Sequence, residues 1–345
     1  MNYFGIVALT TFVITLVLIL GALKVFPKLG LLDRPERYGL SRKPIPYYGG
    51  VLVFLAVLIS SAFFVEWSSG VIGLFLAAGL IVITGFLDDY LRLNPILRLF
   101  IQVVAAMLLV VFGIGILSIS NPLGGVIDLN TVHVYGVPIL GALFTVIWIV
   151  VITNTMNFLD GVGGLSSGVS FIASLTIFFL SIRPGIHADV ASQEVVAVLA
   201  LIIAFCALAF LVFDFPPAKI LMGDSGSTFF GFMLAALAIF SGGKVATAFL
   251  VLGVPILDAG WVILRRIFEG KKPWHGDLKH LHHRLLDLGL EEHKVLYIIY
   301  GLATAFGVLA VVCTSTKQKF FVIIALLVLM LLLVAGVVSK ARKKL

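Results

Sequence analysis

Acidic and amide side chains gather in two short clusters of this sequence, each at the end of a long apolar run. Asp88 and Asp89 form the first cluster, and adjacent carboxylates repel each other unless a cation lies close to them. The second cluster contains Asn154, Asn157 and Asp160, and its two amides share one face of a helix just before a glycine-rich turn. Carboxylate and amide oxygens suit a hard divalent cation that also binds phosphate. These clusters therefore indicate metal-assisted chemistry on a phosphorylated substrate, with helix capping as the structural alternative for the Asp residues.

Two further clusters are suited to binding negatively charged groups. Asp224 lies between small residues at the start of an apolar run, where the free N–H groups of a helix favour an anion. A later loop contains His280, His282, His283 and Arg284, and this pattern suits recognition of a phosphate or a nucleotide. A transition-metal site is less well matched, because no Cys is nearby and the positive neighbours oppose a cation. A basic segment attracted to anionic lipid is the remaining alternative.

Single polar residues elsewhere complete the set of candidates. Lys43 follows Arg42 in a loop in which Pro and Gly stiffen the descent into the next apolar run, and both are expected closer to the presumed site than the earlier positive residues of that loop. Asp258 lies inside an apolar run, so we expect it to be paired or to cap a helix.

The elements that must position these residues are membrane-spanning helices. The chain is 61% hydrophobic and only 12% charged, whereas a soluble domain carries about 25% charged residues. A soluble enzyme is therefore excluded, and the net charge of +7 gives no reason to expect a nucleic-acid partner. The fold class is an all-α polytopic integral membrane protein with about eleven transmembrane helices. We place the spans near 3–26, 46–66, 70–88, 97–118, 138–157, 162–182, 193–213, 225–242, 245–266, 293–315 and 318–339.

The distribution of positive residues predicts the orientation. Twenty of the 24 Lys and Arg residues fall on one side of these spans, and four, Arg183, Lys244, Lys317 and Lys319, fall on the other. Because cytoplasmic loops carry the excess of positive charge, the N-terminus is expected outside, with the C-terminus and the polar clusters in the cytoplasm. An odd number of spans likewise places the two ends of the chain on opposite faces of the membrane.

A small β-hairpin is predicted on the outer side. Residues 125–129 and 132–135 are two short β-prone runs, separated by Asn130 and Thr131. No internal repeat is found, so residues 1–345 are interpreted as a single membrane domain. Its motifs lie within about 31–290, its last two helices within 293–339, and a basic cytoplasmic tail at 340–345.

Five motifs, in this order, resemble the polyprenyl-phosphate N-acetylhexosamine-1-phosphate transferases, known as glycosyltransferase family 4. They are R-K-P-I-P-Y-Y-G-G at 42–50, D-D at 88–89, N-T-M-N-F-L-D-G at 154–161, P-A-K-I-L-M-G-D-S-G-S at 217–227 and H-L-H-H-R-L at 280–285. The last motif is most similar to the branch that transfers GlcNAc-1-phosphate to undecaprenyl phosphate. That branch starts O-antigen, enterobacterial common antigen or teichoic acid linkage units.

The resemblance implies a reaction and its partners. A UDP-N-acetylhexosamine and a polyprenyl phosphate lipid would give polyprenyl-diphospho-N-acetylhexosamine and UMP, with Mg²⁺ as cofactor and Mn²⁺ as an expected substitute. The protein would lie in a bacterial-type plasma (inner) membrane. Whether it forms a homodimer is left open.

The resemblance also implies roles for individual residues. Asp224 would hold Mg²⁺, with Asn157 and Asp88 as further metal ligands, and Asp88, Asp89 and Asp160 would be catalytic. The implied substrate-binding residues are Lys43, Asn154, Asn157, His280, His282, His283 and Arg284.

The chain departs from the family pattern at two positions. The family commonly reads D-G-x-D-G-L where residues 160–165 read D-G-V-G-G-L, so Gly163 replaces an acid that resembles a base-recognising residue. Pro44 replaces a histidine often seen after the R-K pair. The alternatives are the same chemistry with phospho-MurNAc-pentapeptide or a 6-deoxy-N-acetylhexosamine and, from another class, a membrane transporter or flippase.

Overall fold

The computed structural model of the chain describes residues 3–38, 42–121, 124–183, 190–240, 245–270 and 280–342. Every predicted span coincides with a helix, or with a pair of helices in one case. The helices are α1 (Tyr3–Val25), α2 (Gly49–Phe64), α3 (Ser69–Leu91), α4 (Pro95–Val111), α5 (Ile139–Leu159), α6 (Leu165–Ser181), α7 (Val190–Asp214), α8 (Gly223–Phe240), α9 (Val245–Val251), α10 (Gly253–Phe268), α11 (Leu281–Asp287), α12 (Glu292–Val312) and α13 (Thr316–Arg342), and a 3₁₀ helix covers Pro35–Tyr38.

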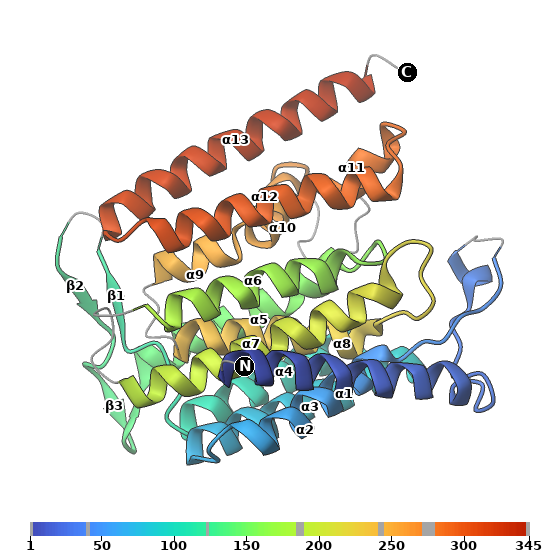
Figure 1. Ribbon diagram of the computed structural model, residues 1–345. Helices are drawn as coiled ribbons and strands as arrows, with labels where there is room; N and C mark the ends of the chain where they lie inside the picture. The colour runs from blue at the N-terminus through green and yellow to red at the C-terminus, as the bar shows by residue number, and fades with distance from the viewer. Residues whose placement is uncertain are drawn as a thin grey trace.

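The helices pack side by side around α8 (Figure 1). This helix contacts α2, α3, α5, α6, α7 and α9, and fifteen of its 18 residues are buried. Its small residues at the start and its Phe, Met and Leu residues further on fill the centre of the bundle. The first turn of α8, which contains Asp224, is thereby fixed against several other helices at once.

Six helices are long and apolar enough to cross a membrane, namely α1, α3, α5, α7, α8 and α12. Three further apolar helices, α2, α4 and α6, have 16 or 17 residues. The chain is therefore a multi-pass membrane protein. The count of eleven spans and the single-domain interpretation stay predictions.

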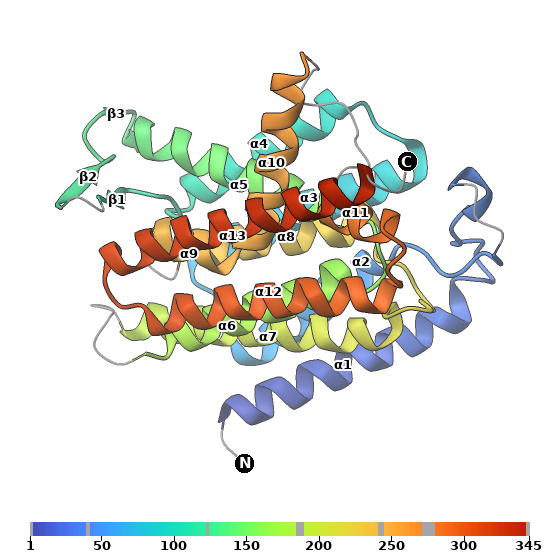
Figure 2. The ribbon, with the colours of Figure 1, turned by 90° about the horizontal axis from the view of Figure 1, so that it is seen from above.

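The predicted span at 245–266 is wrong as one continuous helix, because the structure divides it into α9 and α10. Pro255 has no backbone N–H to donate to the carbonyl of Val251, and Leu252 leaves the helical region between the two helices. Figure 2 shows α10 turning away from the other helices and projecting from the bundle. Asp258 lies on α10 and is buried.

The predicted strand runs form strands, but the pairing predicted between them is wrong. Strand β2 (Val126–Asp128) pairs antiparallel with β1 (Ser118–Ser120), and β3 (His133–Val134) pairs with β4 (Val137–Pro138). Tyr135 and Gly136 both have positive φ, which is the requirement of a tight two-residue hairpin turn. The glycines at 124–125 and 136 make the turns, and the chain does not fold back at Asn130.

The two hairpins lie at one end of the bundle, and the sequence motifs lie at the other end, which we call the motif end (Figure 1). There the loop at 44–50 pairs with the segment before α8, because Gly49 N–H donates to Leu221 O over 3.0 Å and Gly50 N–H to Met222 O over 2.8 Å. On its other side Tyr47 N–H donates to Leu31 O. The first and fourth motifs are thus held together by backbone hydrogen bonds.

Candidate active site

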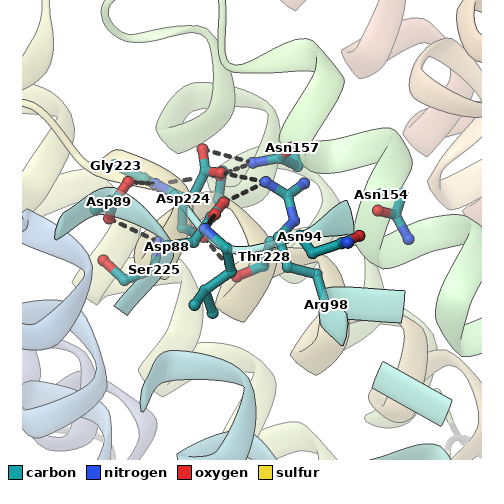
Figure 3. A network of polar contacts seen from close by, with 12 residues as sticks. Asp88, Asp89, Asn94, Arg98, Asn154, Asn157, Gly223, Asp224, Ser225 and Thr228 are labelled. Carbon is teal, nitrogen blue, oxygen red and sulfur yellow. Dashed lines mark hydrogen bonds and ion pairs between the residues drawn. The ribbon is translucent and has the colours of Figure 1, made fainter. Parts of the chain in front are cut away.

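Two carboxylates meet at one cationic nitrogen at the motif end (Figure 3). Arg98 Nη1 donates to Asp88 Oδ2, and the same nitrogen donates to Asp224 Oδ2 over 3.1 Å. Asp88 is buried, while the side chains of Arg98 and Asp224 are 26% and 33% exposed. The pair of carboxylates is therefore open to the outside on the side of Asp224.

The turn between α3 and α4 places Arg98 over Asp88. Helix α3 ends at Leu91, the positive φ of 58° at the cap residue Arg92 reverses the chain, and Leu93 N–H donates to Asp88 Oδ1 over 2.8 Å. Asn94 then caps α4, and Pro95 occupies its first turn. Arg98 comes one turn later, so its side chain reaches back to the carboxylate at the end of the preceding helix.

Asp89 serves a different purpose from its neighbour, because its carboxylate caps α8. Its Oδ1 accepts from the backbone N–H of Asp224 over 2.9 Å and from the Tyr47 hydroxyl over 3.0 Å, and its Oδ2 accepts from Ser225 N–H over 3.2 Å. These N–H groups have no partner inside the helix, and they carry the positive end of its dipole. Gly223 must be a glycine here, since its φ is +74° and a Cβ would lie 2.6 Å from Asp89 Oδ2.

Glycines let the backbones of α2, α3 and α8 approach closely beneath the carboxylates. A Cβ at Gly85 would lie 2.6 Å from Ser225 N and 2.9 Å from Asp224 C, and a Cβ at Gly50 would overlap the backbone of Gly226. Small residues at helix crossings allow such contact inside membranes. The position of Asp224 relative to Asp88 is thus set by backbone packing.

The two amides of the second motif lie apart. Asn157 Nδ2 donates to Asp224 Oδ1 and to Ser227 Oγ, each over 3.0 Å. Asn154 Nδ2 instead donates to Gln102 Oε1 and to the carbonyl of Val150. Figure 3 shows Asn154 set away from the carboxylates. The structure therefore brings Asn157 to the site but ties Asn154 to α4.

The histidine motif is anchored from α10. Asp258 Oδ2 pairs with His280 Nδ1 at 2.8 Å, and Asp258 Oδ1 accepts from Leu281 N–H over 2.7 Å. The ring of His282 stacks 5.9 Å from that of His280 and lies 4.1 Å from that of His283. Residues 271–279 of this loop lie outside the described residues.

His282 faces the glycine-rich turn. It is fully buried, its Nε2 fills the place where Gly161 would carry a Cβ, and neither ring nitrogen has a hydrogen-bond partner among the described residues. Burial, with the nearby His283 and His280 rings, lowers the pKa of His282 from 6.5 to about 3. The imidazole is therefore neutral near pH 7, with one nitrogen able to donate and one able to accept.

The turn after α5 is held from two other helices. Gly164 N–H donates to Asp214 Oδ2 of α7 over 2.9 Å, and the Gly164 carbonyl accepts from the Tyr300 hydroxyl of α12. Asp160 begins this turn as the residue that ends α5. Desolvation, followed by the charges of Asp214 and the other nearby carboxylates, raises the pKa of Asp160 well above its ordinary 3.8. Asp160 is therefore buried close to other carboxyl groups, an arrangement in which a bound cation would favour its ionised form.

Comparison with known proteins identifies the family. The sequence profile of glycosyl transferase family 4 matches residues 71–242. A protein of Bacillus subtilis (strain 168), described as a probable undecaprenyl-phosphate N-acetylglucosaminyl 1-phosphate transferase, is 30% identical over 84% of this chain and 78% of its own length. The chain belongs to glycosyl transferase family 4.

Further relatives within this family span the same part of the chain. The decaprenyl-phosphate N-acetylglucosaminephosphotransferase of Mycolicibacterium smegmatis is 31% identical over 86% of this chain and 79% of its own length. The undecaprenyl-phosphate alpha-N-acetylglucosaminyl 1-phosphate transferase of Escherichia coli (strain K12) is 26% identical over 88% of this chain and 82% of its own length. The family and the branch expected from the motifs are thus confirmed.

The oxygen ligands of this family 4 site are suited to Mg²⁺. No group of three His, Cys, Asp or Glu side chains that could hold a metal is found in the described part of the chain. Mg²⁺, however, is commonly bound by one or two carboxylates together with water and substrate phosphates. Asp88 and Asp224 both accept a hydrogen bond from Arg98 Nη1, and Asn157 donates to the other carboxylate oxygen of Asp224. This donor set fits a metal that is completed by its substrate.

The remaining predicted residues divide between the site and the surface. Lys43 is exposed, and its ammonium group has no hydrogen bond to any described residue. Arg42, beside it, pairs with Asp33, whose Oδ1 also accepts from Ile45 N–H over 2.7 Å. Arg42 thus shapes the first loop of this family 4 chain, while His283 and Arg284 lie beside His282 on α11.

Sequence reasoning missed several residues of this family 4 site. Arg98 was counted only as an orientation charge, although Asn94-Pro95 signals a helix start that places it one turn inside α4. Tyr47, Asp214 and Tyr300 were not singled out, and no local pattern marks them because their partners are distant in sequence.

Proposed function

We propose that this protein transfers an N-acetylhexosamine-1-phosphate, most specifically GlcNAc-1-phosphate, from a UDP-sugar to undecaprenyl or another polyprenyl phosphate, releasing UMP. Its relatives carry names that describe this transfer, and the chain spans most of their length. The reaction would be the first membrane step of cell-envelope glycan synthesis, in the plasma (inner) membrane of a bacterium. The motif end would face the cytosol, as the charge distribution predicts.

The observation that carries this proposal is the meeting of Asp88 and Asp224 at Arg98 Nη1, beside the N-terminus of α8. A phosphoryl transfer needs its charged groups positioned and neutralised more than it needs covalent help from the protein. Two carboxylates for Mg²⁺, a guanidinium and the positive end of the α8 dipole supply that neutralisation in one place.

The acceptor lipid would approach between α3, α4 and α8. A cleft between these helices is lined by Ile81, Thr84, Gly85, Asp88, Arg98, Gln102, Asp224 and Thr228. The cleft has room for about one water molecule, so a single phosphate oxygen of the lipid would enter it. Arg98, at 26% exposed, would bind that phosphate, and Asp88 and Asp224 would hold the metal.

The lipid phosphate oxygen would attack the β-phosphorus of the donor in line with the leaving group. The new bond joins that oxygen to phosphorus, and the bond to the α-phosphate oxygen breaks, so its electron pair leaves with UMP. Mg²⁺, when bound, would neutralise the diphosphate and polarise its P–O bonds. Asp89 and Asn157 would hold Asp224 in place during the transfer, the former through α8 and the latter by a direct hydrogen bond.

The histidine motif would bind the diphosphate or the sugar from the other side. His282 is neutral near pH 7, so its contribution is a directed hydrogen bond, whereas Arg284 beside it would supply positive charge. Asp258 would fix the ring of His280 by accepting from its Nδ1.

The test is UMP release by the detergent-purified protein given UDP-GlcNAc, undecaprenyl phosphate and Mg²⁺. We expect release that requires both lipid and metal, that stops with EDTA, and that exceeds release from UDP-MurNAc-pentapeptide. No UMP from any UDP-sugar would contradict the proposal and favour a transporter.

Two matched variants test the metal assignment. Asp224→Asn should abolish turnover while the protein still inserts and purifies normally. Asp128→Asn removes an equal charge from an exposed residue of β2, at the hairpin end, and should keep full activity. Near-native turnover in Asp224→Asn would refute the role of Asp224.

A further inference from the structure

Tyr135 lies at the tip of the hairpin formed by β3 and β4, which we call the second hairpin (residues 132–138). It is fully exposed, and its hydroxyl has no hydrogen bond to any residue that the structure describes. Its φ of 49° places it, with Gly136, in the left-handed conformation of a tight turn. Asn and Gly adopt this conformation easily, whereas a bulky aromatic residue does so at a cost in conformational energy. Tyr135 therefore strains the turn and buries no surface of its own against the protein.

The second hairpin is fastened to the first residue of α5. Strand β4 runs directly into this helix, and Ile139 N–H donates to Val132 O over 2.9 Å. Val134 pairs with Val137 and closes the turn beyond this hydrogen bond. Figure 1 shows β3 level with the ends of the helices. The depth of the hairpin in the membrane is thus set by the depth at which α5 begins.

Helix α5 has the length of one membrane crossing. Its 21 residues rise about 30 Å, which is the thickness of the hydrocarbon core of a bilayer. Ile139 then lies at the boundary of that core, and the second hairpin, a few residues away, lies in the headgroup layer. The hairpin has open strand edges, whose N–H and C=O groups need water and are not tolerated in the hydrocarbon. The headgroup layer meets both requirements.

Apolar side chains are exposed on the helix and on the hairpin. On α5 they recur at helical spacing along one face, at Leu140, Leu143, Phe144, Ile147 and Val151. On the second hairpin Val132 and Val134 are exposed as well as Tyr135, and residues 132–138 contain no Lys, Arg, Asp or Glu. Exposed apolar groups that gather in this way mark a surface that meets a partner. Lipid covers the exposed face of a membrane-spanning α5, and the same lipid is the partner within reach of the hairpin.

We propose that the second hairpin is a membrane anchor, with the side chain of Tyr135 inserted into the lipid headgroup layer at the hairpin end of the bundle. A Tyr suits this layer because its ring packs against the upper acyl chains while its hydroxyl bonds to water or phosphate. The anchor is independent of the chemistry proposed for the motif end. It has a consequence for that end, however, because α5 carries Asn157 near its other terminus. Fixing the start of α5 at one membrane boundary fixes the depth of Asn157 at the other.

The test measures which solvent surrounds the hairpin in the full-length protein, in nanodiscs of phosphatidylcholine and phosphatidylglycerol. A nitroxide is attached at Val134→Cys, next to the turn, after Cys206 and Cys313 have been replaced by Ala and Ser. Its collisions with oxygen, which concentrates in lipid, are compared with its collisions with a water-soluble nickel chelate. With Tyr135 present, oxygen should dominate. In Tyr135→Asn the turn keeps its conformation, because Asn tolerates positive φ, but the ring is lost, so the nickel chelate should dominate.

Two controls separate anchoring from a damaged turn. Tyr135→Trp keeps an aromatic ring that suits the headgroup layer, so oxygen should still dominate at the Val134 label. A nitroxide at Asp128→Cys replaces an exposed carboxylate of β2, and the nickel chelate should dominate there with Tyr, Asn or Trp at 135.

Three results would overturn the proposal. Dominance of the nickel chelate at the Val134 label with Tyr135 present would place the second hairpin in water. A label shielded from both reagents would show that protein covers the hairpin, such as a second copy of the chain. Equal results for Tyr135→Asn and the unchanged Tyr135 would show that this side chain is not the anchor.

Discussion

The close approach of α3 and α8 at Gly85 gives a direct test of how the carboxylate cluster is positioned. In Gly85→Ala the new methyl group would lie 2.6 Å from Ser225 N and 2.9 Å from Asp224 C. Non-bonded heavy atoms settle about 3.5–4.0 Å apart, so one backbone must retreat by roughly 1 Å. Both neighbours are backbone atoms, and no side-chain rotation can relieve the contact.

The retreat would move Asp224 away from Asp88, because Asp224 is in the first turn of α8. A misplacement of 1 Å at a reacting centre can lower a rate about 100-fold. Overpacking of this kind also costs about 1–3 kcal/mol of folding free energy. We therefore expect a rate of UMP release near 1% of wild type from a protein that is folded but less stable.

Gly79→Ala in the same helix is the control, because its methyl group would lie 3.7 Å from a Phe54 ring carbon, an ordinary contact. Initial rates of UMP release at saturating donor and lipid are compared for both variants and the wild type. Thermal unfolding in detergent shows whether each variant is folded. A folded Gly85→Ala variant that retains more than about a third of the wild-type rate would refute the argument.

Three more predictions follow from contacts of the site. The pKa of His282 is about 3 in the folded protein, against an ordinary value of 6.5 in the unfolded chain. Between these pH values the unfolded chain binds a proton that the folded protein does not bind. The free energy of unfolding therefore falls below pH 6.5, by up to about 1.4 kcal/mol per pH unit. Thermal unfolding at pH 7.5 and 5.0 should show a smaller fall for His282→Asn, and equal falls would contradict this reasoning. Asp258→Asn should lower kcat/KM for the UDP-sugar about tenfold, because the charged acceptor of the buried hydrogen bond to His280 is lost, and an unchanged value would exclude a positioning role. Asn154→Ala should leave the KM for UDP-GlcNAc within threefold of wild type and lower stability by about 1 kcal/mol, because the amide contacts Gln102 of the proposed lipid cleft and not the groups proposed to bind the donor. A large rise in KM would restore its assignment as a substrate-binding residue.

Much of the arrangement was predictable because the chemistry-bearing residues lie at the ends of apolar runs. Each run forms a helix, so polar residues at its start or end must lie at one of the two ends of the bundle. Because successive spans cross in opposite directions, the helix ends that carry Asp88 and Asn157 and the helix start that carries Asp224 lie at the same end. The different roles of the neighbouring residues Asp88 and Asp89 were not predictable. Asp89 caps α8, some 135 residues later in the chain, and only the packing of α3 on α8 reveals this.

Turn chemistry explains the hairpin error. Asn130 and Thr131 looked like the turn because both neighbouring runs favour strands, but the residues with positive φ are Gly124, Gly125, Tyr135 and Gly136. A glycine pair at one turn and a Tyr-Gly pair at the other therefore decided the pairing. Tyr135 is a poor signal for such a conformation, since bulky residues rarely have positive φ.

The two hydrogen bonds that hold Gly164 from α7 and α12 have a consequence for the biogenesis of the protein. Every carboxylate of the cluster is synthesised before residue 225, but Tyr300, which holds the Gly164 carbonyl, and His293, which contacts the carbonyl of Pro216, belong to α12. A chain whose synthesis has reached only α10 therefore carries all the acids of the site around a turn that Asp214 holds but that lacks its support from α12. The complete geometry arises only after α12 has joined the bundle, so a nascent or truncated chain lacks the assembled site.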